Sequence, residues 1–297
     1  MTKPLIAGGV LLVGACMGAS FAQNYPIKPI RIIVPFTPGG GNDISARFIA
    51  QQLTQIFGQQ VVVENRPGAG STVGTDMVAK SAPDGYTLMV IHNAIAINQT
   101  LYPKLPYDAL RDFAQVAMVG VTTNTLVVHP SLPVKSTKDL IALARAKAGS
   151  LNYASTGAGG TSHLAMEYFR LATATNIVHI PYKGTAPALT DMVAGQTQVM
   201  ISALPGTVPF INAKRLIALA TSGNKRSVFL PVKVPREIIM RLNGAIVKSL
   251  ANADVKQQLA NQGIEVSSMT PEEFTQYVRS EIDKMGRIIK ASGAKPE

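Results

Sequence analysis

The stretch Pro35-Phe36-Thr37-Pro38-Gly39-Gly40-Gly41-Asn42-Asp43 joins a predicted buried strand to a predicted helix. The apolar, β-branched run 30–34 precedes it, and apolar residues at helical spacing follow it as far as Gly58. With Asn42 or Asp43 as N-cap, such a turn presents unpaired backbone N–H groups and the positive end of a helix dipole. The stretch therefore predicts an anion site without a charged side chain. The alternative is a tight connection that binds nothing.

A second turn of the same kind follows about 120 positions later. The short strand 151–154 leads into Ser155-Thr156-Gly157-Ala158-Gly159-Gly160, and Thr161 or Ser162 caps the helix predicted over 163–171. Two such half-sites in one chain indicate two α/β lobes that present their anion-binding turns to each other across a cleft.

Composition sets the size and the compartment. The 297 residues are 46% hydrophobic and 15% charged, which suits one large domain or two modest ones. Lys3, an apolar run over 5–17 and the sequence Ala19-Ser20-Phe21-Ala22 predict a secretory signal peptide over 1–22 and export to the periplasm. Lipid attachment at Cys16 is the other interpretation, although the residues before it match a lipoprotein cleavage site poorly.

Removal of the signal peptide leaves 275 residues (297 − 22), a formal charge of +10 (11 − 1) and no cysteine. Disulfides, thiol catalysis and cysteine-ligated zinc are thereby excluded. The Lys and Arg residues are scattered and no aromatic residues interleave with them, so nucleic-acid binding is not predicted. No phosphate-binding loop, serine elbow or metal-ligand spacing is present, so we expect no cofactor and no metal.

The alternative function is a periplasmic α/β enzyme, either a reductase or a hydrolase. The glycine spacing in 68–74 mimics a nucleotide-binding loop, but Pro67 interrupts the junction and Asp84 lies in a turn before the next strand. Ser155 is a candidate nucleophile without a His/Asp pair in the sequence to support it. Of the histidines, His163 follows the second glycine turn and could face the cleft; His129 and His179 are interpreted as structural.

Motifs along nearly the whole mature chain resemble the Bug or TctC family, the extracytoplasmic solute receptors of tripartite tricarboxylate transporters. They are Tyr25-Pro26-Ile27-Lys28-Pro29-Ile30, Pro35 to Arg47, Glu64-Asn65-Arg66-Pro67-Gly68-Ala69-Gly70, Pro83-Asp84-Gly85-Tyr86-Thr87-Leu88, Tyr107-Asp108, Asn152-Tyr153-Ala154-Ser155, His163-Leu164 and Pro181-Tyr182-Lys183-Gly184. The resemblance implies a monomeric, two-lobed, type II-like Venus-flytrap protein that presents a small carboxylate or related metabolite to the subunits of a membrane permease.

The ligand-binding residues expected from the two glycine turns and from this resemblance come from both lobes. They are Phe36, Thr37, Pro38, Gly39, Gly40, Asn42, Asp43, His92, Asn93, Ser155, Thr156, Gly157, Gly159, Gly160, Thr161, His163, Lys183 and Ala203. The resemblance implies that backbone amides, small hydroxyls and ordered water hold the ligand.

The chain departs from the family pattern after Lys225-Arg226-Ser227. The family normally continues there with a Pro-Thr segment, an acidic helix and a strand, whereas here 229–234 runs almost directly into Pro235-Arg236-Glu237-Ile238. We therefore expect lobe 1 over 23–123, lobe 2 over 124–225, and a shortened second crossover with C-terminal helices over 226–297. An unfilled strand position, lower stability and weak closure are expected to follow.

Overall fold

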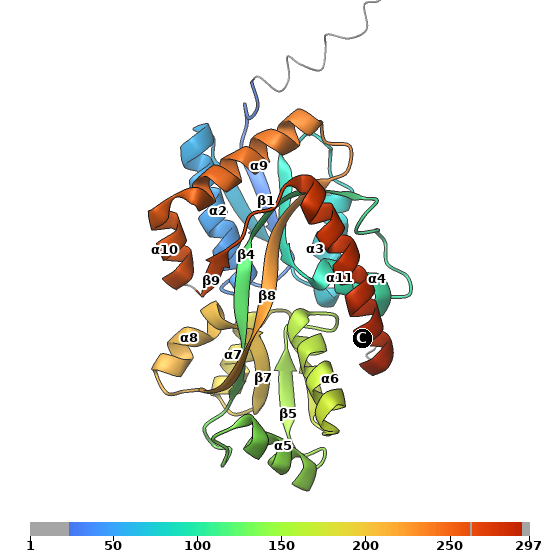
Figure 1. Ribbon diagram of the computed structural model, residues 1–297, viewed down its shortest axis with the longest axis vertical. Helices are drawn as coiled ribbons and strands as arrows, with labels where there is room; N and C mark the ends of the chain where they lie inside the picture. The colour runs from blue at the N-terminus through green and yellow to red at the C-terminus, as the bar shows by residue number, and fades with distance from the viewer. Residues whose placement is uncertain (1–23, 262, 293–297) are drawn as a thin grey trace, which may run out of the picture.

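The computed structural model describes residues 24–261 and 263–292, which form two α/β lobes stacked along the long axis (Figure 1). The predicted signal peptide and Cys16 lie outside the described residues. The first lobe contains β1 (Ile30–Val34), α2 (Gly41–Phe57), β2 (Val61–Asn65), η1 (Ala69–Ser71), α3 (Thr72–Ala79), β3 (Thr87–His92), α4 (Ala94–Leu101), α9 (Arg236–Ala251), α10 (Ala253–Asn261), β9 (Ile264–Val266) and α11 (Pro271–Ser292). The second contains α5 (Thr137–Ala146), β5 (Asn152–Ser155), α6 (Thr161–Thr173), β6 (Val178–Pro181), α7 (Thr185–Val193), β7 (Val199–Ala203) and α8 (Leu204–Asn212).

Two long strands, β4 (Phe113–Val128) and β8 (Ile217–Pro231), run through both lobes. They pair antiparallel along their length, from Phe113 opposite Pro231 to Val128 opposite Ile217. The strand order is β2-β1-β3-β8-β4-β7-β5-β6, with β9 joining β4. One end of the β4–β8 pair therefore completes the sheet of the first lobe, and the other end completes the sheet of the second.

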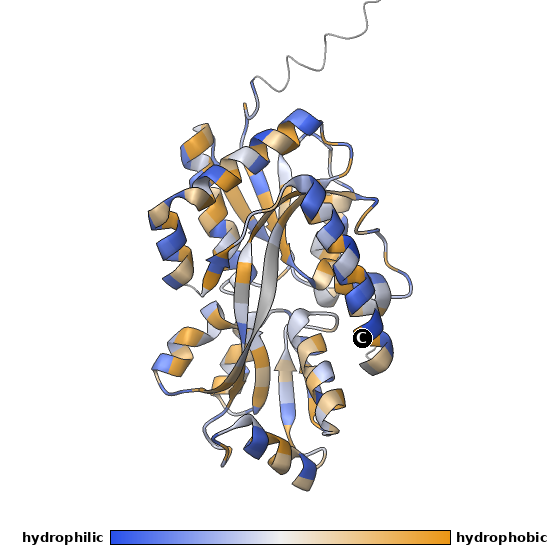
Figure 2. Cartoon of the chain, in the orientation of Figure 1, coloured by the Kyte–Doolittle hydropathy of each residue, from blue (hydrophilic) through white to orange (hydrophobic). Residues whose placement is uncertain are grey.

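Each lobe has its own apolar core. In the core of the first lobe, β1, β3 and residues 228–230 of β8 pack with α2, α9 and α11. In the second lobe Leu126 and Val128 face one apolar cluster while Val127 faces another. A strand buried on both faces needs such an unbroken apolar run. The helices that cover the sheets turn polar residues outward, as the blue segments of α11 show (Figure 2).

The expectation of an unfilled strand position in the first lobe is wrong. Residues 227–231, expected to be part of a short crossover, are the last part of β8 and lie between β3 and β4. Met89 of β3 pairs with Phe229, and Gln115 of β4 pairs with Phe229 on the other side. The shortened connection begins only after Pro231, where the four residues 232–235 precede α9. The backbone groups of β3 and β4 therefore have their partners, and the proposed cause of low stability and weak closure is absent.

We predict that Phe229→Ala lowers the free energy of unfolding by about 3–5 kcal/mol. The Phe229 side chain is 1% exposed and packs against Phe113 and Phe274, with ring centroids 6.3 and 5.0 Å away. Val232→Ala is the control, because Val232 lies just past the strand and is 36% exposed; it should cost less than about 1 kcal/mol. Urea unfolding measures both changes. Equal, small costs would mean that 227–231 is a surface connection.

Candidate functional site

An inner cavity of about 30 Å³ lies between the lobes, where the N-terminal ends of α2 and α6 meet. Each helix follows a strand, β1 or β5, through one of the two glycine-rich turns. The inner cavity is lined by Phe36, Gly40, Gly41, Asn42, His92, Asn124, Thr156, Thr161, Ser162, Thr185, Ile201, Ser202 and Ala203. No Lys, Arg, Asp or Glu is among these residues. Any preference for an anion must therefore come from backbone amides and neutral polar side chains.

Several amides of the two turns are already used inside the protein. Gly39 N–H donates to Asp43, Thr156 N–H to Ser162, and Gly157 N–H to Ser155. Gly159 N–H donates to His163 Nδ1. Bound in this way, these amides shape the turns and are not available to a ligand.

Further amides lie in the first helical turns. Helices α2 and α6 have Gly40 and Gly160 as N-caps, and neither N-cap makes a side-chain capping hydrogen bond. The first N–H groups of a helix have no acceptor within the helix. Residues 41–42 of α2 and 161–162 of α6 carry such groups, and all four residues line the inner cavity. The site thus has two sets of free donors from opposite lobes.

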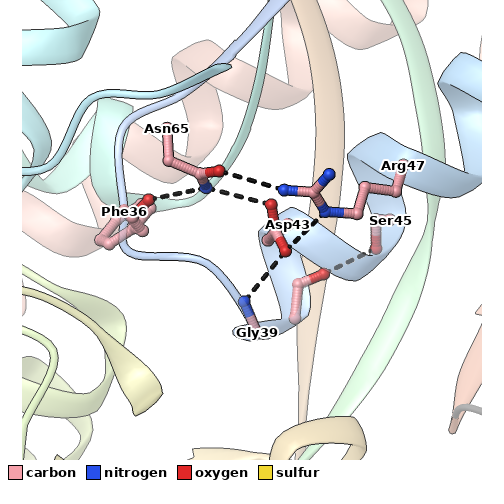
Figure 3. Close-up of polar contacts among 7 residues, drawn as sticks. Phe36, Gly39, Asp43, Ser45, Arg47 and Asn65 are labelled. Atoms are coloured by element: carbon pink, nitrogen blue, oxygen red, sulfur yellow. Dashed lines mark hydrogen bonds and ion pairs between the residues drawn. The ribbon is translucent and has the colours of Figure 1, made fainter. Parts of the chain in front are cut away.

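Asp43 holds the first turn in place (Figure 3). Its carboxylate accepts hydrogen bonds from Gly39 N–H at 2.9 Å, Arg47 Nε at 3.0 Å and Asn65 Nδ2 at 3.0 Å. Asn65 also donates to the carbonyl of Phe36. Burial alone would raise the pKa of Asp43, but the hydrogen bonds from Arg47, Gly39 and Asn65 together keep it below its ordinary value. Asp43 is therefore ionised and stabilises the first turn, and it lines neither the inner nor the outer cavity.

The second turn is held by a buried polar group beneath it. Ser155 is fully buried, and its Oγ lies 2.6 Å from His179 Nε2. The rings of His163 and His179 stack with centroids 4.3 Å apart. Burial, with the neighbouring His163 and Arg170, lowers the pKa of His179 to about 3. The two neutral histidines therefore stabilise the second turn. Ser155 is poorly placed to attack a substrate, because it is buried and its hydroxyl accepts a hydrogen bond from Gly157 N–H.

The lobes touch each other around the site. Thr161 Oγ1 of α6 lies 2.9 Å from His92 Nδ1 at the end of β3. Ala94 N–H donates to the same nitrogen, so Nδ1 is an acceptor and the Thr161 hydroxyl donates to it. Tyr102 Oη donates to the carbonyl of Ala158 across the cleft at 3.1 Å. The structure is therefore that of a closed cleft.

An outer cavity of about 540 Å³ adjoins the inner one, since Phe36 and Thr156 line both. Its other lining residues are Pro35, Thr37, Gly68, Ala69, Gly70, Ser71, Gly157, Pro181, Tyr182, Lys183 and Pro187. Lys183 is the one charged residue of this lining and is exposed. The two cavities together offer a small polar end and a wider space beyond it.

The residues expected from the sequence divide into three groups. Lining the inner cavity are Phe36, Gly40, Asn42, His92, Thr156, Thr161 and Ala203; Thr37, Gly157 and Lys183 line the outer cavity. Lining neither cavity are Pro38, Gly39, Asp43, Asn93, Ser155, Gly159, Gly160 and His163. Asn93 is turned toward α11, where its Nδ2 donates to Glu281 at 2.6 Å.

Sequence reasoning missed six residues of the inner lining: Gly41, Asn124, Ser162, Thr185, Ile201 and Ser202. Gly41 lies within the first quoted turn and Ser162 was named as a possible helix cap, so both could have been included. Asn124, Ile201 and Ser202 come from the middle of β4 and the end of β7, where the sequence carries no glycine-rich signal. Only the pairing of these strands brings them to the cleft.

Within 24–261 and 263–292, no three His, Cys, Asp or Glu side chains are grouped so that they could hold a metal ion. No helix in these ranges has the length and apolar character needed to cross a membrane.

Comparison with known proteins places the chain in a family. Residues 45–232 match the TctC family, described as Tripartite tricarboxylate transporter family receptor. BugT of Bordetella pertussis is 35% identical over 99% of both chains. That alignment spans 322 positions, so BugT has at least 25 residues (322 − 297) without a counterpart here.

Solved structures agree with this placement. An adipate-bound protein from R. palustris is 30% identical, with a TM-score of 0.89 over 92% of this chain and 100% of its own. The malate-bound MatC of Rhodopseudomonas palustris is 27% identical, with a TM-score of 0.85 over 89% of this chain and 100% of its own. The two-lobed fold is thus that of a periplasmic solute receptor, and the chain belongs to the tripartite tricarboxylate transporter receptor (TctC, or Bug) family.

Proposed function

We propose that the protein captures a small carboxylate between its lobes, in the periplasm after removal of residues 1–22, and presents it as a monomer to the permease subunits of a tripartite tricarboxylate-type transporter. We also propose lobe limits at 23–123, 124–225 and 226–297, with β8 crossing the last limit. Adipate and malate in the related structures support the ligand class.

One observation above all supports a carboxylate as the ligand. The free first-turn amides of α2 and α6 come from opposite lobes and face one cavity with no charged side chain in its lining. Each helix N-terminus carries roughly half a positive charge, so two of them together favour an anion. Both sets of amides can reach the same carboxylate only when the lobes are closed, so binding shifts the open–closed equilibrium toward the closed form. Closure also removes water, which strengthens each N–H···O⁻ hydrogen bond.

The two features that suggested an enzyme, the Gly68–Gly74 loop and Ser155, both have structural roles. The Gly68–Gly74 loop is used for contact between the lobes, since a Cβ on Gly70 would lie 1.8 Å from the carbonyl oxygen of Ala158. Ser155 is fully buried under the second turn. Neither feature presents a reactive group to the inner cavity, which supports a binding protein.

We predict that a carboxylate binds at least about tenfold more tightly than its neutral amide, because the amide loses the charge-assisted hydrogen bonds. Calorimetry would compare adipate and succinate with adipamide and succinamide on ligand-free protein, after a thermal-shift screen of mono-, di- and tricarboxylates. Equal affinity for acid and amide, or no binding by any acid, would contradict the proposed ligand class.

We predict that Gly70→Ala prevents closure and lowers ligand affinity at least about tenfold, because the new Cβ overlaps the Ala158 carbonyl of the other lobe. Gly58→Ala is the matched control. Gly58 has φ +66° and Gly70 has φ +58°, so both carry the same left-handed strain, but a Cβ on Gly58 meets nothing within 4 Å. Small-angle scattering with saturating ligand should show contraction in the control alone. Contraction and unchanged affinity in Gly70→Ala would refute the role of this contact.

We predict that Asp43→Asn destabilises the protein by about 1–3 kcal/mol near pH 7, because a carboxylate with three donors is lost. The folded-state pKa of Asp43 is lowered, so its stabilisation is present above the unfolded pKa, about 4, and is lost as the pH falls through the folded pKa. Wild type and variant should therefore converge in stability in acid. A constant difference between pH 7 and pH 2 would exclude an ionised Asp43 as the cause.

A further inference from the structure

An apolar cluster joins the two lobes outside both cavities. Its buried side chains are at most 5% exposed, and two partly buried side chains pack against them. The six residues, here called the interlobe cluster, are Ile97, Leu101 and Tyr102 at α4, Leu164 of α6, and Met285 and Ile289 of α11. Helices α4 and α11 belong to the first lobe and α6 to the second. None of the six residues lines the inner or the outer cavity.

Helix α11 takes part in two separate apolar clusters. Phe274 and Val278 in its first half are buried in the core of the first lobe. Met285 and Ile289 in its last half belong to the interlobe cluster instead. At 1.5 Å per residue, Ile289 lies roughly 16 Å beyond Val278 along the helix axis. The last turns of α11 therefore extend past the core of the first lobe, beside α4, and contact α6 of the second lobe (Figure 1).

The last half of α11 is attached to the first lobe. Gly286 lies close to α4, where an added Cβ would be 3.1 Å from Thr100 Oγ1. Earlier in the helix, Glu281 accepts a hydrogen bond at 2.6 Å from Asn93, the residue that precedes α4. Because α11 and α4 are fixed to each other, separation of the lobes would break the contacts that Leu164 makes within the cluster.

Leu164 connects the interlobe cluster to the binding site. It lies in α6 two residues after Ser162, and residues 161–162 carry the first-turn amides at the inner cavity. The turn before α6 is also close to α4, since a Cβ on Gly159 would be 2.8 Å from Leu101 Cδ2. Leu164 is 3% exposed with the lobes closed, and opening would return it to water. Since burial of apolar surface is favourable, the cluster stabilises the closed form.

The polar contacts between the lobes contribute less to closure. The Thr161 hydroxyl donates to His92, and Tyr102 donates to the carbonyl of Ala158. Water molecules can take the place of these partners when the lobes separate, so the net gain from each hydrogen bond is small. Water offers no such replacement for the apolar contacts of Leu164.

We propose that the interlobe cluster sets the ligand affinity from outside the binding site, by stabilising the closed form. This rests on the proposed function, in which the ligand binds the closed form. The apparent dissociation constant is then the intrinsic constant divided by the fraction of protein that is closed. A change in the cluster alters that fraction and leaves every contact with the ligand in place. It therefore changes the affinity for all ligands by the same factor.

The test replaces Leu164 by Ala and measures affinity and shape. Calorimetry on the ligand-free protein would use acetate, succinate, adipate and citrate. We expect Leu164→Ala to weaken every acid that the wild type binds by one common factor, at least about tenfold. Small-angle scattering would compare the dimensions of the wild type and the variant without ligand.

Ile289→Ala tests the interlobe cluster from the first lobe, at a residue outside α6 and outside both glycine-rich turns. We expect it also to weaken all the acids by one common factor. This second variant distinguishes a loss of closure from a local disturbance of α6, because Ile289 is remote in sequence from the ligand-binding amides.

Leu140→Ala is the matched control. Leu140 is a fully buried leucine of α5, and its apolar cluster contains residues of the second lobe alone. The control should lower the melting temperature as Leu164→Ala does, because both changes leave a cavity. It should keep the wild-type affinity for every acid, and thermal melts would show that all three variants are folded.

The outcomes separate this inference from the proposed function. If the wild type binds none of the four acids, the proposed function is wrong. If Leu164→Ala and Ile289→Ala bind within about threefold of the wild type, with unchanged dimensions, the inference is wrong and the function stands. A loss confined to some of the acids, or an equal loss in Leu140→Ala, would also overturn the inference.

Discussion

The antiparallel pairing of β4 with β8 is the constraint on which the rest of the structure depends. Both strands pass from one lobe to the other, and their hydrogen bonds continue through the crossing. The register shifts around Met118 and Gly120, where β9 joins, and a Cβ on Gly120 would lie 2.4 Å from the carbonyl oxygen of Glu265. Glycine is therefore required for this close approach. The paired strands fix which ends of β1 and β5 face each other, and thereby where α2 and α6 begin.

That placement forms the binding site, and the backbone amides of the two turns and of the helices after them have two different uses. Some amides are bound by side chains of the same turn: Asp43 takes the Gly39 N–H, and Ser162 takes the Thr156 N–H. These hydrogen bonds rigidify the turns before any ligand arrives, which lowers the entropic cost of binding. The remaining first-turn amides carry the affinity for an anion. Rigid donors that need no reorientation suit a receptor whose lobes must close around a small solute.

Local patterns were sufficient to predict the elements around the site. The strand at 30–34 and the helix that ends before Gly58 were predicted and are confirmed as β1 and α2. The helix starts were less accurate, because Gly40 is the N-cap and Asp43 binds Gly39 N–H from inside the first turn.

Long-range pairing could not be predicted from local patterns. Ser202 and Asn124 reach the site only because β4 and β7 pair, and the contact of Ser155 with His179 depends on the parallel neighbours β5 and β6. The apolar run Val228-Phe229-Leu230 is itself typical of a buried strand. This strand was not predicted, because the family resemblance implied that the strand returning to the first lobe belonged to the segment that this chain lacks.

A crystal structure with a bound small carboxylate tests the central claim most directly. We expect carboxylate oxygens within about 2.7–3.2 Å of first-turn amide nitrogens from both α2 and α6, with no charged side chain in contact with them. A carboxylate held by Lys183 in the outer cavity, or by the amides of one lobe alone, would contradict this account.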